Sequence, residues 1–303
     1  MNLKTLPIVI FLLNLMSSCA PVIEKDTIVC TTTIVADIVN HLKPPSVGLM
    51  GPGVDPHLYK SKSNDHLLLN ESKVIVYSGL HLEGKMTDAL ENLSTKKSVI
   101  KLSEGIDPTL LITSPDFAGS YDPHFWFDIN LYQDAVKHCS SELQKQFPQF
   151  KDTIASNTKL YLLALDNLAK DIDSMFLELP KEKRILITAH DAFSYYGKAH
   201  EMKVKGIQGA STAAEAGLKD ITDLVDYIIK NKVSAIFVES SVSKRNIEAI
   251  IEGCDRKGHE LSLGGSLFSD ALGDTTTGGE TYIKMMIHNS RTIVNALNQN
   301  HAN

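Results

Sequence analysis

A long helical stripe between two stretches of strand–helix alternation limits the folds open to this 303-residue chain. From residue 161 onward its apolar positions recur at spacings of four and three, which is the period of one helix face. The apolar positions of the whole segment, 151–179, are Ile154, Tyr161, Leu165, Leu168, Ile172, Met175 and Leu179. The pattern stops at Pro180, so the predicted helix is roughly 40 Å long at about 1.5 Å per residue. A helix of this length can run along two domains.

On both sides of this segment, β-branched strand patterns alternate with amphipathic helix patterns. The predicted strands are 27–34, 74–77 and 98–102, then 184–189 and 235–239. The predicted helices are 81–93 and 130–147, then 218–231, 243–258 and 279–298. Such alternation is typical of parallel sheets covered by helices. We therefore expect an α/β fold of two lobes, each with a parallel sheet flanked by helices, joined by one long backbone helix.

The first 19 residues predict an export signal. Lys4 precedes an apolar run at 6–16, which is shorter than the roughly 20 residues that span a bilayer but suits a signal peptide. Ser17-Ser18-Cys19-Ala20 then resembles a bacterial lipoprotein cleavage site, although Met16 stands where Leu is usual. We expect Cys19 to be lipidated, with plain secretion as the alternative. The predicted domains are a signal peptide (1–19), an N-terminal lobe (20–150), a linking helix (151–179) and a C-terminal lobe (180–303).

Composition and motifs exclude several classes of protein. Thirty basic and 36 acidic residues give a net charge of −6, and there is no basic stripe, which argues against nucleic acid as a partner. Cys30, Cys139 and Cys254 form no CxxC pair, so we interpret them as core residues. The sequence also lacks an HExxH helix, a GxSxG elbow, a Walker loop and a dinucleotide fingerprint.

The tripeptide Asp-Pro-His occurs twice, at 55–57 and 122–124. Proline fixes its own φ and holds the preceding residue in an extended conformation, so each His lies in a stiff loop. The Asp can orient the imidazole by accepting its second N–H, as carboxylates do for metal-bound histidines. His57 and His124 are therefore candidate metal ligands.

Two more candidates each have a structural alternative. His190 ends the strand 184–189, where ligands of α/β sheets gather, and His190 and Asp191 could instead, or in addition, cap the next helix. Asp270 lies in a loop, where carboxylates usually are solvated turn formers. Glu239, at the end of strand 235–239, either supports a ligand by a hydrogen bond or forms a salt bridge.

Seven segments carry a resemblance to a known family. They are GVDPHLYK (53–60), GLHLEGKM (79–86), DPHFWFD (122–128), TAHDAFSYYG (188–197), GIQGASTAAEA (206–216), IFVESSV (236–242) and LFSDALGD (267–274). From about residue 26 to its end, the chain resembles the solute-binding proteins of zinc- and manganese-importing ABC transporters. The resemblance implies one metal ion buried between the lobes, with His57 and His124 of the first lobe and His190 and Asp270 of the second as its ligands.

The resemblance also implies a monomer outside the cytoplasm that delivers its cargo to a permease and its ATPase. The lipid anchor would hold this monomer at the membrane. One Zn²⁺ or Mn²⁺ per chain is the expected cargo. Three imidazoles and one carboxylate suit zinc, and a bidentate Asp270 would admit manganese. In the family that the chain resembles, the third ligand is often Glu in manganese carriers and His in zinc carriers, so His190 favours zinc slightly. Many zinc carriers of that family also have a His-rich loop before the second ligand, but residues 103–121 contain no histidine.

Two other functions stay open at this point, a secreted zinc hydrolase and a surface adhesin. A hydrolase needs an open coordination position for an activated water, which four protein ligands do not leave.

The rigid helix also predicts a small closure on metal binding instead of a wide hinge motion. Phe125, Trp126 and Phe127 either shield the second ligand and pack where the lobes meet, or have a core role alone.

Overall fold

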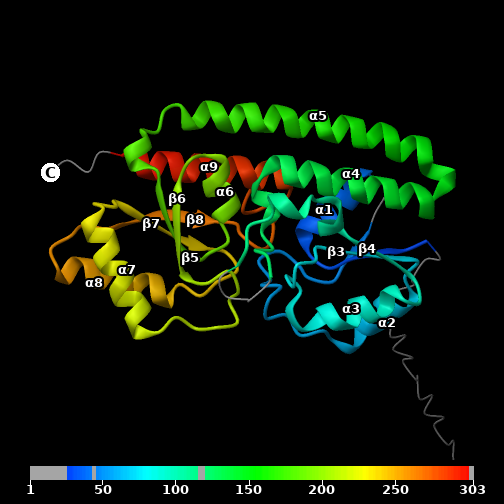
Figure 1. Ribbon diagram of the computed structural model, residues 1–303, viewed down its shortest axis with the longest axis horizontal. Coiled ribbons are helices and arrows are strands. Elements are labelled where there is room, and N and C mark those ends of the chain that lie inside the picture. Colours follow the sequence, from blue (N-terminus) through cyan, green and yellow to red (C-terminus); the bar gives the residue numbers. More distant parts are fainter. Residues whose placement is uncertain (1–25, 43–45, 115–119, 300–303) are drawn as a thin grey trace, which may run out of the picture.

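The computed structural model describes residues 26–42, 46–114 and 120–299, so the predicted signal peptide and Cys19 lie outside the described residues. Two α/β lobes lie side by side, and helix α5 (Lys151–Phe176) runs along both of them (Figure 1). Each lobe has parallel strands flanked by helices. The fold class expected from the sequence is confirmed.

The first lobe has a four-stranded parallel sheet in the order β2-β1-β3-β4. Its strands are β1 Ile28–Cys30, β2 Val47–Gly48, β3 Val74–Tyr77 and β4 Ser98–Lys101. Helices α1 (Thr33–Leu42) and α4 (Ile129–Gln146) lie on one face of this sheet, and α2 (Ser63–Glu71) and α3 (Thr87–Ser94) lie on the other (Figure 1).

Two predicted elements of this lobe begin or end elsewhere, for local reasons. The strand predicted at 27–34 ends at Cys30, because the Thr32 hydroxyl accepts the N–H of Val35 and starts α1. The helix predicted at 81–93 begins only at Thr87, because Leu80 and His81 adopt left-handed φ values of 54° and 63°. Hydrophobic periodicity does not reveal either feature.

The second lobe pairs its four strands as β5-β6 and β7-β8, both parallel, with β5 and β7 side by side. The strands are β5 Ile185–His190, β6 Lys203–Gln208, β7 Ala235–Glu239 and β8 Ser262–Leu267. The helices are α6 Ser194–Ala199, α7 Leu218–Lys230, α8 Arg245–Arg256 and α9 Tyr282–Asn298. The carboxyl ends of β5, β7 and β8 lead toward the first lobe.

Helix α5 packs on both lobes, and its buried side chains belong to a hydrophobic core that the two lobes share. Its buried side chains are Ile154, Tyr161, Leu165, Leu168, Ile172 and Phe176, so the predicted stripe is correct except near its end. The helix stops at Phe176, three residues before the predicted end. It packs on α1 and α4 of the first lobe and on α9 of the second. Tyr132 of α4 stacks on Tyr282 of α9 with ring centroids 3.7 Å apart, so the core is continuous between the lobes.

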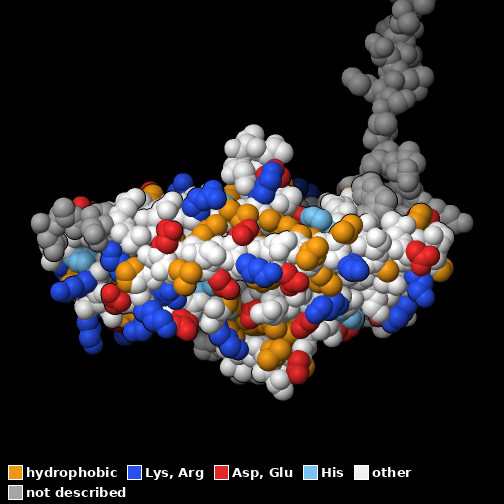
Figure 2. Space-filling view, turned by 90° about the horizontal axis from the view of Figure 1, so that it is seen from above, with side chains coloured by type: hydrophobic (Ala, Val, Ile, Leu, Met, Phe, Trp, Pro, Cys, Tyr) orange, Lys and Arg blue, Asp and Glu red, His pale blue; other side chains and the backbone are white. Residues whose placement is uncertain are grey.

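The surface over α5 carries both signs of charge. Figure 2 shows this face, on which basic and acidic side chains alternate without a large patch of one sign. Within the described ranges, no helix is both long enough and apolar enough to cross a membrane. Cys30, Cys139 and Cys254 are free and buried, as predicted.

Candidate metal centre

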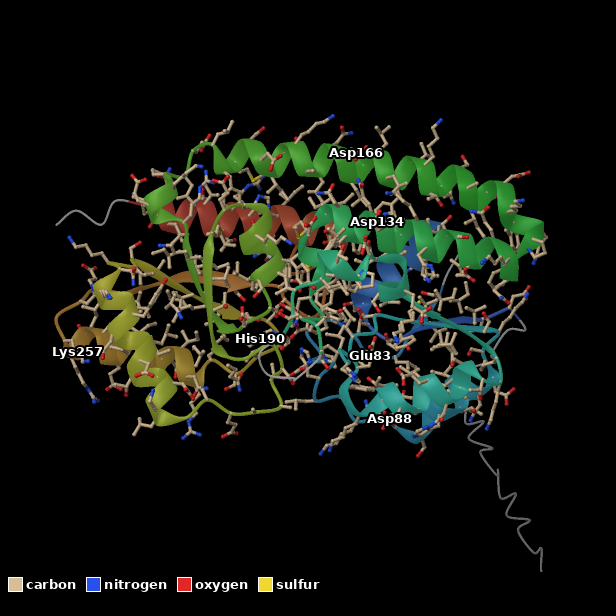
Figure 3. All side chains as sticks on the ribbon, viewed as in Figure 1. Glu83, Asp88, Asp134, Asp166, His190 and Lys257 are labelled. Carbon is tan, nitrogen blue, oxygen red and sulfur yellow. The ribbon has the colours of Figure 1, made fainter. Side chains whose placement is uncertain are left out.

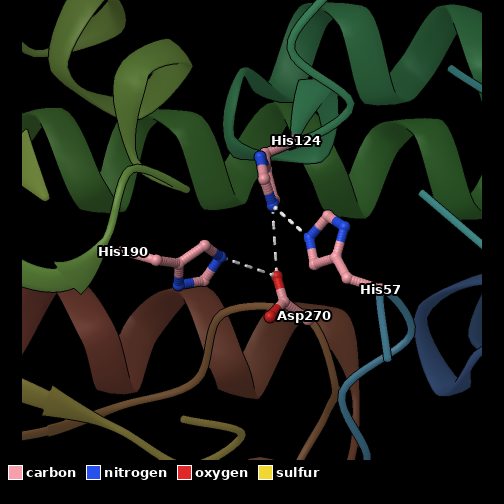
Figure 4. Close-up of side chains that lie close together, drawn as sticks. All are labelled: His57, His124, His190 and Asp270. Atoms are coloured by element: carbon pink, nitrogen blue, oxygen red, sulfur yellow. Dashed lines mark hydrogen bonds and ion pairs between the residues drawn. The ribbon is translucent and has the colours of Figure 1, made fainter. Parts of the chain in front are cut away.

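Four side chains from separate loops and strand ends meet where the lobes join. His57 lies between β2 and α2, and His124 comes directly before the turn Phe125–Phe127. His190 is the last residue of β5, and Asp270 follows β8. One ligand atom from each of the four lies within 4.8 Å of all the others. Figure 4 shows the three imidazole rings turned toward the carboxylate of Asp270.

The distances within this cluster suit a small cation at its centre. His124 Nε2 lies 3.4 Å from His57 Nε2 and 3.2 Å from Asp270 Oδ1, and His190 Nε2 lies 3.3 Å from the same oxygen. A tetrahedral zinc site with bonds of about 2.0–2.1 Å has neighbouring ligand atoms about 3.3–3.4 Å apart. These three separations therefore match the edge of such a tetrahedron.

Burial makes this arrangement costly without a cation. His124, His190 and Asp270 have no exposed surface, and His57 is 6% exposed. In the described structure, His190 Nε2 and Asp270 Oδ1 have no partner of hydrogen-bond geometry, although they lie within ion-pair distance. Buried polar atoms without a partner are rare and call for an explanation. A metal ion bound at the centre of the cluster would supply the missing partner for both atoms.

Asp122 fixes His124 as the repeated tripeptide predicts. Its Oδ1 accepts both the backbone N–H of His124, at 2.9 Å, and the ring Nδ1–H, at 2.7 Å. With the proton held on Nδ1, the lone pair of Nε2 points to the centre of the cluster.

The other Asp-Pro-His copy works differently. Asp55 Oδ1 accepts the backbone N–H of His57 at 2.8 Å, which holds the loop but not the ring. Its Oδ2 accepts the hydroxyl of Thr212, at 2.6 Å, from the second lobe. The prediction that the Asp orients the ring is thus correct for His124 and wrong for His57.

Glu239 supports His190. One carboxylate oxygen accepts the backbone N–H of His190 at 2.9 Å, and the other lies 2.6 Å from Nδ1. Glu239 is 1% exposed, so this is a buried contact. The alternative that His190 and Asp191 cap a helix is wrong, because α6 begins only at Ser194. Asp191 accepts the Ser194 hydroxyl instead. Figure 3 shows His190 near the junction of the lobes.

The cluster's charges are strongly coupled. Burial lowers the pKa of His57 to about 3. Burial also disfavours the charged form of His124, but Asp122 and Asp270 outweigh it and raise its pKa to about 9. Against the same burial, Asp270 and Glu239 hold the pKa of His190 well above its usual value. Burial favours the neutral acid of Asp270, yet His190 and His124 keep its pKa well below the usual range. The charge of each of these four side chains therefore depends on the charges of the others.

The aromatic run after His124 closes the site on one side. The indole of Trp126 meets the His124 ring edge-on, with centroids 5.2 Å apart. Its Nε1–H donates to the carbonyl of Ser269, next to Asp270, at 3.2 Å. Phe127 packs on Phe193 of the second lobe, 4.4 Å between centroids. This run therefore shields the second histidine and packs the lobe interface, which is the first of its two alternative roles.

Two polar residues of the site were not predicted. Ser241 donates its hydroxyl to Asp270 Oδ2 at 3.1 Å, and Thr212 contacts Asp55 as described above. Both lie in segments that carry the family resemblance, but a single hydroxyl in a loop has no spacing or pattern that points to a role. Of the histidines in the described ranges, only the three predicted ones belong to the cluster.

Comparison with known proteins supports the same conclusion. The family described as "Zinc-uptake complex component A periplasmic" matches residues 28–296. The manganese-binding lipoprotein MntA of Bacillus subtilis is 41% identical over 273 residues, which cover 89% of each chain. The zinc-binding protein TroA of Treponema pallidum is 40% identical over 276 residues, covering 90% of this chain and 89% of TroA. A solved structure of TroA matches with a TM-score of 0.87 over 90% of this chain and 99% of that chain.

Two lobes on one long helix, with a buried donor set between them, define a solute-binding protein of the metal-binding class. The match over nearly the whole described chain makes the assignment more specific. The chain belongs to the zinc-uptake complex component A family, whose members are substrate-binding components of metal importers.

Proposed function

We propose that this protein captures one divalent transition metal outside the cytoplasm and delivers it to the permease and ATPase of an ABC importer. The ligands are His57, His124, His190 and Asp270. One observation carries the proposal: three imidazoles and one carboxylate, distant in sequence, lie within 4.8 Å of one another in a buried site. Family membership supports the transport role.

Zinc is the ion that the donor set favours. Three imidazoles and one carboxylate oxygen fill a tetrahedral zinc site. Manganese favours more oxygen ligands, which would require both oxygens of Asp270. Because Asp270 Oδ2 accepts the Ser241 hydroxyl at 3.1 Å, monodentate coordination through Oδ1 is favoured. The relatives differ in this respect, since MntA is named manganese-binding and TroA zinc-binding.

The protein is a carrier, not an enzyme. A zinc hydrolase keeps one coordination position for a water whose pKa the metal lowers. Here four protein ligands surround the ion and a carboxylate supports the third of them, so no position remains for an activated water. An additional role as a surface adhesin has no supporting contact or surface among the described residues.

We further propose that residues 1–19 direct export and that a lipid on Cys19 anchors the mature monomer to a membrane. The name of the Bacillus relative, a lipoprotein, supports this. The lobes are then 20–150 and 180–303, with the linking helix at 151–179. Metabolic labelling with a radioactive fatty acid tests the anchor: the full chain should be labelled and Cys19→Ser should not.

Metal titration of the purified chain tests the ligand set. We expect one Zn²⁺ per chain by elemental analysis after dialysis, and His124→Ala should lose the bound ion while keeping its circular dichroism spectrum. The matched control is His138→Ala, which changes a histidine of α4 outside the cluster. If His124→Ala holds zinc as tightly as the wild type, the proposed site is wrong.

A further inference from the structure

One of the four proposed ligands borders a surface pocket. The pocket has a volume of about 610 Å³ and opens between the lobes. Its walls include His57 and Gly84 of the first lobe and Ser211 and Ala213 of the second. His57 is also the only one of the four ligands with exposed surface. An ion that leaves the cluster by this side therefore passes His57 last.

The second-lobe wall of this pocket is tied to the loop of His57. Thr212 lies between Ser211 and Ala213 in the segment that joins β6 to α7. Its side chain, 7% exposed, donates to Asp55 Oδ2 at 2.6 Å, and Asp55 Oδ1 accepts the backbone N–H of His57 at 2.8 Å. One carboxylate thus connects the wall of one lobe to the ligand of the other.

We propose that Thr212 is a positioning residue that acts through Asp55 on His57 and controls how fast the ion leaves. The proposal rests on the function proposed above. For release through the pocket, either the loop that carries His57 must move or the wall at 211–213 must lift, and both motions strain the shared carboxylate. A hydrogen bond from a hydroxyl to a charged carboxylate is among the stronger kinds, and this one is partly buried. Its loss should lower the barrier to release more than it disturbs the fold.

The test measures zinc dissociation from the purified full chain by stopped-flow mixing with excess chelator. Thr212→Val keeps the shape of the side chain but removes the donor, and Thr212→Ala serves as a second variant. We expect both to release zinc roughly tenfold faster or more, the loss of one charge-assisted hydrogen bond. Thr212→Ser, which keeps the hydroxyl, should release zinc at close to the wild-type rate.

The matched control is Thr222→Val in α7, whose hydroxyl donates to the Leu218 carbonyl of its own helix at 2.9 Å. A merely structural role for Thr212 would lower the melting temperature of the metal-free chain and leave the release rate unchanged. The proposal would be overturned if folded Thr212→Val and Thr212→Ala released zinc at the wild-type rate. It would also be overturned if Thr212→Ser released zinc as fast as Thr212→Val does. The two failures are distinguishable, because zinc lost from His124→Ala upholds the site even where Thr212→Val behaves as wild type.

Discussion

Replacing Glu239 with glutamine tests how the protein keeps His190 ready for an ion. One carboxylate oxygen accepts the backbone N–H of His190 at 2.9 Å, and the other lies within ion-pair distance of the ring Nδ1, at 2.6 Å. A glutamine of the same shape has only one acceptor oxygen and offers an NH₂ donor in place of the other. If the amide oxygen keeps the backbone N–H, the NH₂ faces Nδ1 and moves the ring proton to Nε2. The nitrogen that should bind metal is then blocked.

The size of the effect follows from this conflict. Loss of a carboxylate that supports a metal-bound histidine typically weakens binding 10–100-fold. At free zinc 1,000 times the wild-type dissociation constant, the wild type gains about 4 kcal/mol of stability. At the same zinc concentration the variant should gain roughly 1.4–2.7 kcal/mol. This difference in zinc stabilisation between the wild type and the variant is large enough to measure by unfolding.

Urea unfolding measures the free energy of unfolding of each variant, once at a buffered free zinc concentration and once without zinc. The difference between the two values is the stabilisation by zinc. Asp191→Asn is the matched control, because it removes a neighbouring carboxylate whose contact is with Ser194 and should leave the zinc effect unchanged. Equal zinc stabilisation of Glu239→Gln and the wild type would show that the tautomer of His190 does not limit binding.

Three further predictions concern other parts of the molecule. Gly84→Ala should weaken zinc binding, because a Cβ there would lie 2.4 Å from the His57 carbonyl oxygen and push that residue aside. Isothermal titration calorimetry measures the affinity, and an unchanged melting temperature of the metal-free variant shows that it is folded. Gly258→Ala is the control, because Gly258 also has a positive φ but a Cβ there would meet open space. Burial lowers the pKa of His200 to about 4, so the stability that its neutral form provides is present above about pH 6.5 and is lost as the pH falls toward 4. Relative to His200→Phe, the metal-free wild type should lose about 2 kcal/mol between pH 7 and pH 5 in urea melts, and parallel curves would contradict this. Small-angle scattering should show nearly equal radii of gyration for the metal-free and zinc-loaded chain, and a large contraction would disprove the rigid-helix prediction.

Periodicity alone predicts much of this fold. The stripe of α5 and the β-branched strands read correctly because each buries one face or both, and burial is what hydrophobic periodicity reports. Periodicity does not predict the left-handed turn at Leu80 and His81, because the turn depends on the contacts of one buried side chain. The buried carboxylate of Glu83 accepts the N–H groups of Ser78 and Gly79, and the Thr31 hydroxyl, and so holds this turn.

The site is less readable from residues alone. A stiff loop predicts His57 and His124, because proline restricts the backbone without help from the rest of the fold. For Asp270 the residues give little, since a loop carboxylate is ordinary until three histidines surround it. The family resemblance is what indicates Asp270 as the fourth ligand. The structure adds what the resemblance does not give, namely that the two Asp-Pro-His copies have different roles.

Those unlike roles separate binding strength from exchange rate. His124 and His190 have their rings fixed by buried carboxylates, so substitutions there should change affinity. His57 has only its backbone fixed, by a carboxylate shared with Thr212. Because the core is continuous between the lobes along α5 and α9, wide hinge motion would expose much apolar surface, and release must use a smaller local motion. The pocket borders His57, so we expect this motion there and expect the release rate and the affinity to respond most to different residues.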